Sequence, residues 1–432
     1  MRIAIVGSGI SGLAAAWLLS RAHDVVLFEA DDRLGGHTHT HEIALDGERH
    51  AVDTGFIVHN RAHYPLLTRL FEALGVPTQP TTMSFSVQCE RTGFEYSSEP
   101  GGLLGGRNFA SPRFYALMRD VARFYRVAPS LLEDGGDGPT LGEFLARHRF
   151  GDAFRDLHLV PMASALWSSP SHRILEFPAR CLAEFMHNHD MLTFGRRPSW
   201  RVVTGGSRRY IDAMQASWRV DVRTGTPVQS IRRDIDFVEI SHSGRVERFD
   251  HAVLATHSDD ALALLTDADD AERDVLGAMP YQSNDVVLHT DETLLPHRRS
   301  AWAAWNAFVP CDPAQAATVS YCMNRLQRLD ATRTYVVTLN RTDAIEPARV
   351  LRRMTYRHPL HSHASFAAQA RKAEIQGHRR TWFAGAYWGW GFHEDGMRSA
   401  CEVAGALGVR WGAASPAAPP ASVPLTPGFA VP

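Results

Sequence analysis

The sequence predicts an α/β protein whose first domain is built around a parallel β-sheet. The first 30 residues form a strand–helix–strand unit: the apolar run 2–6, a helical stretch over 13–22 and a second apolar run over 25–30. The chain has 432 residues, which is long enough for two large hydrophobic cores. Hydrophobic residues make up 44% and charged residues 21%, as is typical of globular proteins.

Glycines with a specific spacing separate the first strand from the first helix. In GSGISG, Gly7 permits a tight turn, Gly9 lets a pyrophosphate approach the backbone, and Gly12 allows close packing of helix and strand. The helix N-terminus offers free N–H groups to the phosphates. Glu29, at the end of the second strand, can accept hydrogen bonds from the ribose hydroxyls. The alternative is a glycine-rich turn without a ligand. The expected dinucleotide contacts of this unit are Gly7, Gly9, Ser11, Gly12, Glu29 and Ala30.

A second glycine pair follows in EADDRLGGH. Arg33, Gly35 and Gly36 complete the pattern E-x-x-x-R-x-G-G, which resembles the superfamily of flavin amine oxidases, protoporphyrinogen oxidases and phytoene desaturases. The resemblance implies that FAD is the cofactor and that the pair follows its pyrophosphate and ribityl chain. Most members carry arginine after the pair, whereas this chain has His37, which is still expected to contact the cofactor.

Three alternating histidines in GGHTHTH raise the question of a metal site. His37, His39 and His41 would point the same way from a strand and could bind zinc. No carboxylate or cysteine cluster nearby completes such a site. We therefore expect no metal, with His37 next to the cofactor and the other two as partly exposed strand residues.

Later segments resemble the remaining cofactor-binding parts of the superfamily. VDTGFIVHN resembles the Asp-x-Gly turn near the isoalloxazine ring, and Val228 matches the residue whose backbone meets the adenine. FAGAYWGWGFHEDG resembles the closing motif, in which a helix N-terminus faces the flavin pyrimidine and stabilises negative charge there. Trp388 and Trp390 are expected to crowd the same pocket. The cofactor contacts that this resemblance implies are Thr54, Gly55, Phe56, Val228, Gly385, Phe392, His393 and Gly396.

The motif positions imply a Rossmann-like FAD-binding domain with an interleaved α+β substrate domain, as in amine oxidases. The FAD-binding domain is expected from segments 1–80, 200–275 and 375–412, and the substrate domain from 81–199, mostly helical, and 276–374, mostly strands. Residues 413–432 are rich in alanine and proline and are expected to be disordered.

Further segments, including PMASALWSSP and FMHNHDMLTF, resemble one bacterial group of predicted FAD-dependent oxidoreductases. Members of that group tend to be encoded beside methyltransferases that resemble cyclopropane-fatty-acid synthase. This association implies a lipid acyl chain as the substrate and a methyltransferase as a partner.

The residues near the expected flavin favour a substrate other than a simple amine. Amine oxidases of the superfamily commonly hold a water near flavin N5 with a lysine, but Lys372, the only lysine, lies in an expected surface helix. His393 and Glu394 are the candidate catalytic acid–base residues. The alternative is structural: a backbone contact for His393 and a helix N-terminal charge for Glu394.

The leading hypothesis is an FAD-dependent oxidoreductase that oxidises or desaturates a lipid-like substrate at flavin N5. The alternatives are an amine oxidase, an FAD-dependent isomerase and a non-catalytic flavoprotein partner of a lipid methyltransferase. We expect the FAD to be non-covalent, because no cysteine occurs in the closing segment before Phe392.

Charge and apolar patterning restrict partners and location. The net charge of −2, without a long basic tract, gives no reason to expect nucleic acid. The five cysteines lack a pattern, which is typical of reduced thiols in the cytoplasm. A helix over residues 111–127, with Ser111 as its cap, carries four arginines. It either covers the core or contacts anionic lipid headgroups, which would place the protein peripherally at the inner membrane.

Overall fold

The fold is that of a computed structural model. It describes residues 1–103, 108, 110–133, 138–167, 171–192, 198–312 and 315–411. The expected disordered tail, residues 413–432, lies outside the described residues.

A five-stranded parallel sheet unites segments that are far apart in the sequence. Its order is β10-β2-β1-β14-β20, and Ile3 of β1 pairs with Val25 on one side and His251 on the other. β1 and β2 are almost entirely buried, as expected of apolar parallel strands covered on both faces. The strands are β1 (Arg2–Val6), β2 (Asp24–Phe28), β10 (Val220–Arg223), β14 (His251–Leu254) and β20 (Thr381–Phe383).

Side chains of β1 alternate between two cores. Ile3 and Ile5 face a cluster that contains α1, α2, α10 and α15. Ala4 and Val6 face a second cluster, with α11, α12 and the antiparallel sheet β11-β12-β13. The bounds are α1 (Ile10–Leu19), α2 (Pro65–Ala73), α10 (Arg208–Ser217), α11 (Ser258–Leu264), α12 (Asp270–Gly277), α15 (His393–Ala406), β11 (Val228–Arg233), β12 (Val238–His242) and β13 (Arg245–Phe249).

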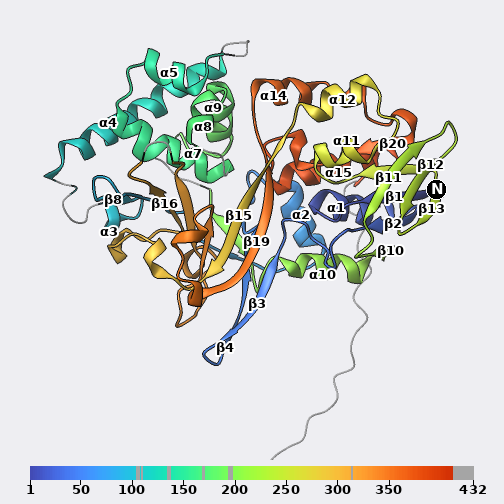
Figure 1. Ribbon diagram of the computed structural model, residues 1–432, viewed down its shortest axis with the longest axis horizontal. Helices are drawn as coiled ribbons and strands as arrows, with labels where there is room; N and C mark the ends of the chain where they lie inside the picture. The colour runs from blue at the N-terminus through green and yellow to red at the C-terminus, as the bar shows by residue number, and fades with distance from the viewer. Residues whose placement is uncertain are drawn as a thin grey trace, which may run out of the picture.

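A mixed seven-stranded sheet forms the centre of the molecule (Figure 1). Its order is β19-β15-β18-β17-β16-β7-β8, and the parallel pair β16–β7 joins the two expected substrate-domain segments. The strands are β7 (Phe85–Cys89), β8 (Phe94–Ser97), β15 (Tyr281–His289), β16 (Trp305–Val309), β17 (Thr318–Cys322), β18 (Val336–Leu339) and β19 (Val350–Pro359). The short helix α13 (Met323–Leu326) follows β17, and α14 (His363–Ala370) follows β19.

A group of helices lies at the end of the molecule opposite the parallel sheet (Figure 1). Helix α4 (Pro112–Val127) matches the helix predicted from the arginine-rich segment, although the Ser111 side chain makes no cap hydrogen bond. Arg119 and Arg123 of α4 pair with the buried Asp120, so two of its four arginines have structural partners. The other helices are α3 (Pro100–Leu103), α5 (Leu141–Arg147), α6 (Asp152–Phe154), α7 (Val160–Trp167), α8 (Ser171–Glu176) and α9 (Ala179–Asn188).

Two small sheets connect the parallel sheet with the seven-stranded one. The hairpin β3–β4 contributes Ile43 and Val52 to the core of the seven-stranded sheet, although both residues fall in the segment expected for the FAD-binding domain. The chain thus crosses between the two sheets within residues 40–58. The strands are β3 (Thr40–Leu45), β4 (Glu48–Asp53), β5 (Val58–Asn60), β6 (Thr78–Pro80) and β9 (Trp200–Val203). Within the described ranges, no helix has both the length and the apolar character needed to cross a membrane.

Candidate functional site

The first glycine loop is closed by contacts that leave no room for side chains, except at Gly9. A Cβ atom on Gly12 would lie 1.9 Å from the carbonyl oxygen of Gly7. Gly7 has φ +98°, and a Cβ there would lie 2.8 Å from the oxygen of Ala255. A Cβ on Gly9 would meet no atom within 4 Å, so the open side of the loop is next to Gly9. This is the arrangement that a pyrophosphate at the N-terminus of α1 requires.

Glu29 is held against the same loop. One carboxylate oxygen accepts hydrogen bonds from the backbone N–H of Ser8, at 2.8 Å, and from its hydroxyl, at 2.5 Å. The other accepts the backbone N–H of Asp31 at 2.9 Å. A carboxylate has about four acceptor positions, so Glu29 retains capacity for ribose hydroxyls. Ala30, which follows it, is exposed.

The second glycine pair lies directly on the first loop. The N–H of Gly35 donates to the carbonyl of Ser8 at 3.0 Å, and a Cβ on Gly36 would lie 3.0 Å from Cα of Gly9. Arg33 donates to the carbonyl oxygens of Gly36, at 2.9 Å, and Thr38, at 3.2 Å. Arg33 therefore stabilises the turn that contains Gly35 and Gly36.

The Asp-x-Gly turn packs on the backbone of His37. The N–H of Phe56 donates to the oxygen of His37 at 2.8 Å, and a Cβ on Gly55 would come within 1.8 Å of that oxygen. The preceding Asp53 is buried and accepts the N–H of Ser207 at 3.0 Å and the amide of Gln327 at 3.2 Å. Burial raises the pKa of Asp53 to about 6. The Asp53 carboxylate thus connects the residue before α10 with the residue after α13.

The His37 ring lies in a group of side chains that sequence reasoning did not identify. Its centroid is 5.3 Å from those of Tyr356 and His358 and 5.9 Å from that of His257. Its buried Nε2 atom has no hydrogen-bond partner, and burial holds the pKa of His37 well below its usual range. Tyr281 completes the group by stacking on His257 at 4.1 Å. The sequence offered only one signal, the alternating ring residues Tyr356 and His358 in TYRHP.

The other two alternating histidines, His39 and His41, pair with each other. Their rings lie against each other, with centroids 3.9 Å apart. His39 hydrogen-bonds the hydroxyl of Tyr356 at 3.0 Å, and His41 that of Thr54 at 3.2 Å. Thr54 also hydrogen-bonds Tyr356 at 2.7 Å. The three histidines are therefore not arranged around one point.

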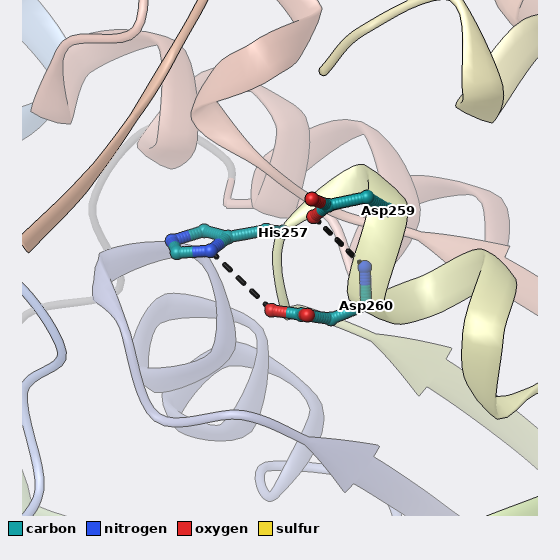
Figure 2. A group of neighbouring side chains, drawn as sticks. All are labelled: His257, Asp259 and Asp260. Carbon is teal, nitrogen blue, oxygen red and sulfur yellow. Dashed lines mark hydrogen bonds and ion pairs between the residues drawn. The ribbon is translucent and has the colours of Figure 1, made fainter. Parts of the chain in front are cut away.

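Among the described residues, one group of three side chains has the spacing of metal ligands: His257, Asp259 and Asp260. Figure 2 shows the three at the start of α11, with His257 directed toward Asp260 at 3.4 Å. Arg357 forms ion pairs with both carboxylates, and its bond to Asp260 measures 2.9 Å. Each of the two carboxylates therefore already has a cationic partner, although one guanidinium offsets only one of the two negative charges.

His393 begins α15 and joins it to the second glycine segment. Its Nε2 atom is 3.0 Å from the hydroxyl of Thr38, and its ring stacks on Phe56 at 3.7 Å. Burial lowers the pKa of His393 to about 3, so the imidazole is neutral near pH 7. The structure places His393 among the cofactor-binding segments, where it can accept or donate one hydrogen bond but carries no charge.

Glu394 has a clear structural task. Its two oxygens accept the N–H groups of Leu66 and Leu67 at 2.9 and 3.0 Å, and so cap the N-terminus of α2. This arrangement favours the structural role over the expected catalytic one. Two residues later, a Cβ on Gly396 would lie 2.8 Å from the hydroxyl of Ser11, so α15 and α1 meet at these two positions.

Aromatic side chains cover the segment just before α15. Phe392 stacks on Phe185 of α9 at 5.3 Å, and His189 lies 6.0 Å from Phe392. Trp390 lies 6.1 Å from Phe185 and 5.4 Å from Phe366. These five residues, which we call the aromatic wall, are contributed by α9, α14 and the loop before α15.

Trp388 does not belong to the aromatic wall, and its expected place in the flavin pocket stays a prediction. Its indole N–H donates to the carbonyl of Phe383 at 3.0 Å, and the side chain packs in the core beside α12. The Lys372 ammonium nitrogen lies 5.3 Å from the centre of the Trp388 ring and pairs with Glu402 of α15. Lys372 is therefore outside the group of cofactor-binding segments.

Two predicted cofactor residues are positioned through their neighbours. Val228 begins β11, and the N–H of Thr226, two residues before it, donates to the carbonyl of Glu29 at 2.8 Å. The N–H of Gly385 donates to the hydroxyl of Ser399 in α15 at 3.1 Å. Both lie at the ends of elements that surround the first glycine loop.

Comparison with known proteins identifies the class. The family of flavin containing amine oxidoreductases matches residues 10–408, and the chain belongs to this family. This match confirms the predicted superfamily and FAD as the cofactor, with which the glycine loops and Glu29 are compatible.

Solved structures confirm the predicted two-domain α/β fold. Cyclohexylamine oxidase from Brevibacterium oxydans is 18% identical, with a TM-score of 0.67 over 94% of this chain and 98% of that one. A fatty acid isomerase from P. acnes, which produces CLA, is also 18% identical, with a TM-score of 0.66 over 92% of this chain and 96% of that one.

Curated relatives match part of the chain. A carotenoid phi-ring synthase of Streptomyces griseus is 29% identical over 59% of this chain and 52% of its own length. The flavin-dependent L-tryptophan oxidase RebO of Lentzea aerocolonigenes is 25% identical over 61% of this chain and 58% of its own length. The chain thus spans little more than half the length of these relatives.

Proposed function

We propose that the protein is an FAD-dependent oxidoreductase that oxidises or desaturates a lipid-like substrate, such as an acyl chain. The observation that carries this proposal is the aromatic wall beside the cofactor-binding segments. Trp390 and Phe392 are partly buried there and pack on the buried Phe185, whereas the nearby carboxylates of Glu394 and Asp395 are occupied by backbone N–H groups. An apolar chain can pack on such a surface without leaving a polar group unpaired.

FAD supplies hydride acceptance when it is bound. The chain's own residues contribute position and electrostatics. The open side of the loop next to Gly9 leaves space for a pyrophosphate, and the N-terminus of α15 can stabilise negative charge. His37 and His393 present neutral imidazoles beside these loops, and the unpartnered Nε2 atom of His37 is free to make one hydrogen bond.

The distant position of Lys372 supports a substrate other than a simple amine. In the part of the chain that the structure describes, this sole lysine pairs with Glu402 on α15 and lies over the ring of Trp388, which is not part of the aromatic wall. The names of two similar proteins, a carotenoid phi-ring synthase and a fatty acid isomerase, point to apolar substrates. Those of a tryptophan oxidase and a cyclohexylamine oxidase support the alternative of amine oxidation.

The proposal is tested by anaerobic titration of the FAD-loaded protein with long-chain acyl lipids, with amines as the matched comparison. We expect acyl lipids to bleach the flavin absorbance and to yield an unsaturated product by mass spectrometry. Bleaching by amines alone would instead establish an amine oxidase. Conversion of a lipid to an isomer without net bleaching would establish an isomerase.

Two interactions extend this proposal. A lipid methyltransferase partner would deliver a methylated acyl chain, and the exposed Arg126 and Tyr115 on α4 provide a surface for anionic headgroups. Co-purification with the methyltransferase and sedimentation with anionic vesicles test the two separately. If no lipid or amine reduces the flavin and the methyltransferase binds tightly, the protein is a non-catalytic partner.

A further inference from the structure

A cavity of about 350 Å³ lies at the end of the seven-stranded sheet, where β16 and β18 end and β15 and β17 begin. Ser164 and Ala165 of α7 cover it from one side. The volume is within the range of small-molecule sites, roughly 300–1,000 Å³. Its lining is apolar at Phe308, Val319 and Leu339.

One cation lies in this lining. The Arg341 guanidinium carbon is 3.4 Å from the centre of the Phe308 ring, which fixes the planar group at the cavity wall. Burial lowers the pKa of Arg341, with Glu90 acting in the opposite direction, and arginine stays charged in proteins regardless. Among the described residues, no carboxylate forms an ion pair with Arg341. A partly buried guanidinium without an acid partner is ready to bind an anion.

Hydrogen bonds connect the cavity to the His37 group. The amide of Asn340 donates to Oδ1 of Asn284 at 2.8 Å, and the amide of Asn284 lies 3.0 Å from Nδ1 of His358. The His358 ring is in turn 5.3 Å from that of His37. The path crosses from the end of β18 over β15 to β19, which is two strand spacings, or roughly 10 Å.

We propose that this cavity binds the carboxylate and adjoining carbons of a long-chain fatty acid, with Arg341 paired to the carboxylate. The inference rests on the proposed function and deepens it, because it specifies a free acid rather than a neutral lipid or an amine. Arg341 provides the planar, charged partner that carboxylates prefer. Phe308, Val319 and Leu339 pack on the methylene groups next to the carboxylate. A neutral headgroup would leave Arg341 unpaired, and an ammonium group would be repelled.

The test is equilibrium binding of hexadecanoate and hexadecan-1-ol to the FAD-loaded protein by isothermal titration calorimetry. Wild-type protein is expected to bind the acid at least tenfold more tightly than the alcohol. In Arg341→Gln, the affinity for the acid should fall roughly ten- to a hundredfold, as expected for one lost charge-assisted hydrogen-bond pair, while the affinity for the alcohol stays unchanged. Arg147→Gln, at an exposed position in α5, is the matched control and should retain wild-type affinity.

Equal affinity of the wild type for acid and alcohol would overturn the inference without any variant, so the test survives an Arg341→Gln protein that fails to fold. Undiminished acid binding by a folded Arg341→Gln protein would overturn it as well. Failure of the proposed function is a separate result. In that case hexadecanoate binds in an Arg341-dependent way, but no acyl lipid reduces the flavin.

Discussion

The cofactor side and the substrate side of this chain are built in opposite ways. Around the expected FAD, the backbone segments that contain Gly9, Gly36 and Gly55 approach one another so closely that a methyl group would not fit at two of the three. Around the expected substrate, large rings such as Phe185 and Trp390 fill the space between elements. The first region recognises its ligand through backbone groups, and the second through side-chain shape and a few charges. Substitutions should therefore have different effects in the two regions.

The largest expected difference is within the first glycine loop itself. Gly12→Ala places a Cβ 1.9 Å from the oxygen of Gly7, whereas Gly9→Ala places one where no atom lies within 4 Å. We expect Gly12→Ala to lose FAD and about 3 kcal/mol of stability or more. Gly9→Ala should lose FAD but keep the unfolding temperature of the apoprotein. Visible absorbance and thermal unfolding measure both, and equal behaviour of the two variants would contradict this account of the loop.

Acid should destabilise the substrate side and the surroundings of the cofactor together. Burial lowers the pKa of His189, His289, His358 and His361 to about 4 and that of His393 to about 3. Between about pH 6.5 and 4 the unfolded chain binds protons at these positions and the native protein does not, so the free energy of unfolding falls as the pH falls.

Buried carboxyl groups act against this trend. Burial raises the pKa of Asp53 to about 6, so its native carboxyl group takes up a proton before the unfolded one does, and burial raises the pKa values of Glu394 and Asp395 in the same direction. Because one proton corresponds to about 1.4 kcal/mol per pH unit, the net loss should reach several kcal/mol. Urea unfolding at pH 7, 6 and 5 measures it, and His358→Asn should reduce the slope. A free energy of unfolding that stays constant would show that the native and unfolded states take up the same number of protons, and that burial does not lower the pKa values of these histidines.

Glu394→Gln separates a structural from a catalytic role at the boundary between the two sides. Loss of one acceptor at the N-terminus of α2 should reduce stability by about 1 kcal/mol. FAD content and turnover at saturating substrate should change little. Chemical unfolding and anaerobic flavin reduction measure these effects. A turnover reduced a hundredfold or more, with FAD and stability retained, would restore Glu394 as a catalytic residue.

The smallest effect is expected at Lys372. Lys372→Met removes a half-exposed ion pair with Glu402, whose contribution to stability is about 1 kcal/mol or less. The rate of flavin reduction should stay within about twofold of the wild type, because the lysine is paired with Glu402 and lies over Trp388, outside the aromatic wall. Stopped-flow absorbance measures the rate. A tenfold or greater loss would place a lysine-held water in the reaction and favour amine oxidation.

The sequence alone determined the strand–helix–strand unit, the glycine loop and Glu29. These features are local: steric limits on Gly7 and Gly12, and the spacing to the end of β2, operate within 30 residues. The family resemblance then extended the prediction to distant segments such as Gly55 and Gly396.

Only the tertiary structure decided what surrounds these segments. The packing of His257 and His358 around His37 depends on the register between β15 and β19 and on where α11 begins, neither of which is set by local sequence. Glu394 was a candidate acid until the fold brought the N-terminus of α2 against it. The cavity beside Arg341 likewise exists because two strands end and two begin at one edge of the sheet, next to Ser164 and Ala165 of α7. Such contacts join residues that are hundreds of positions apart, so their chemistry depends on packing and is not encoded in any short motif.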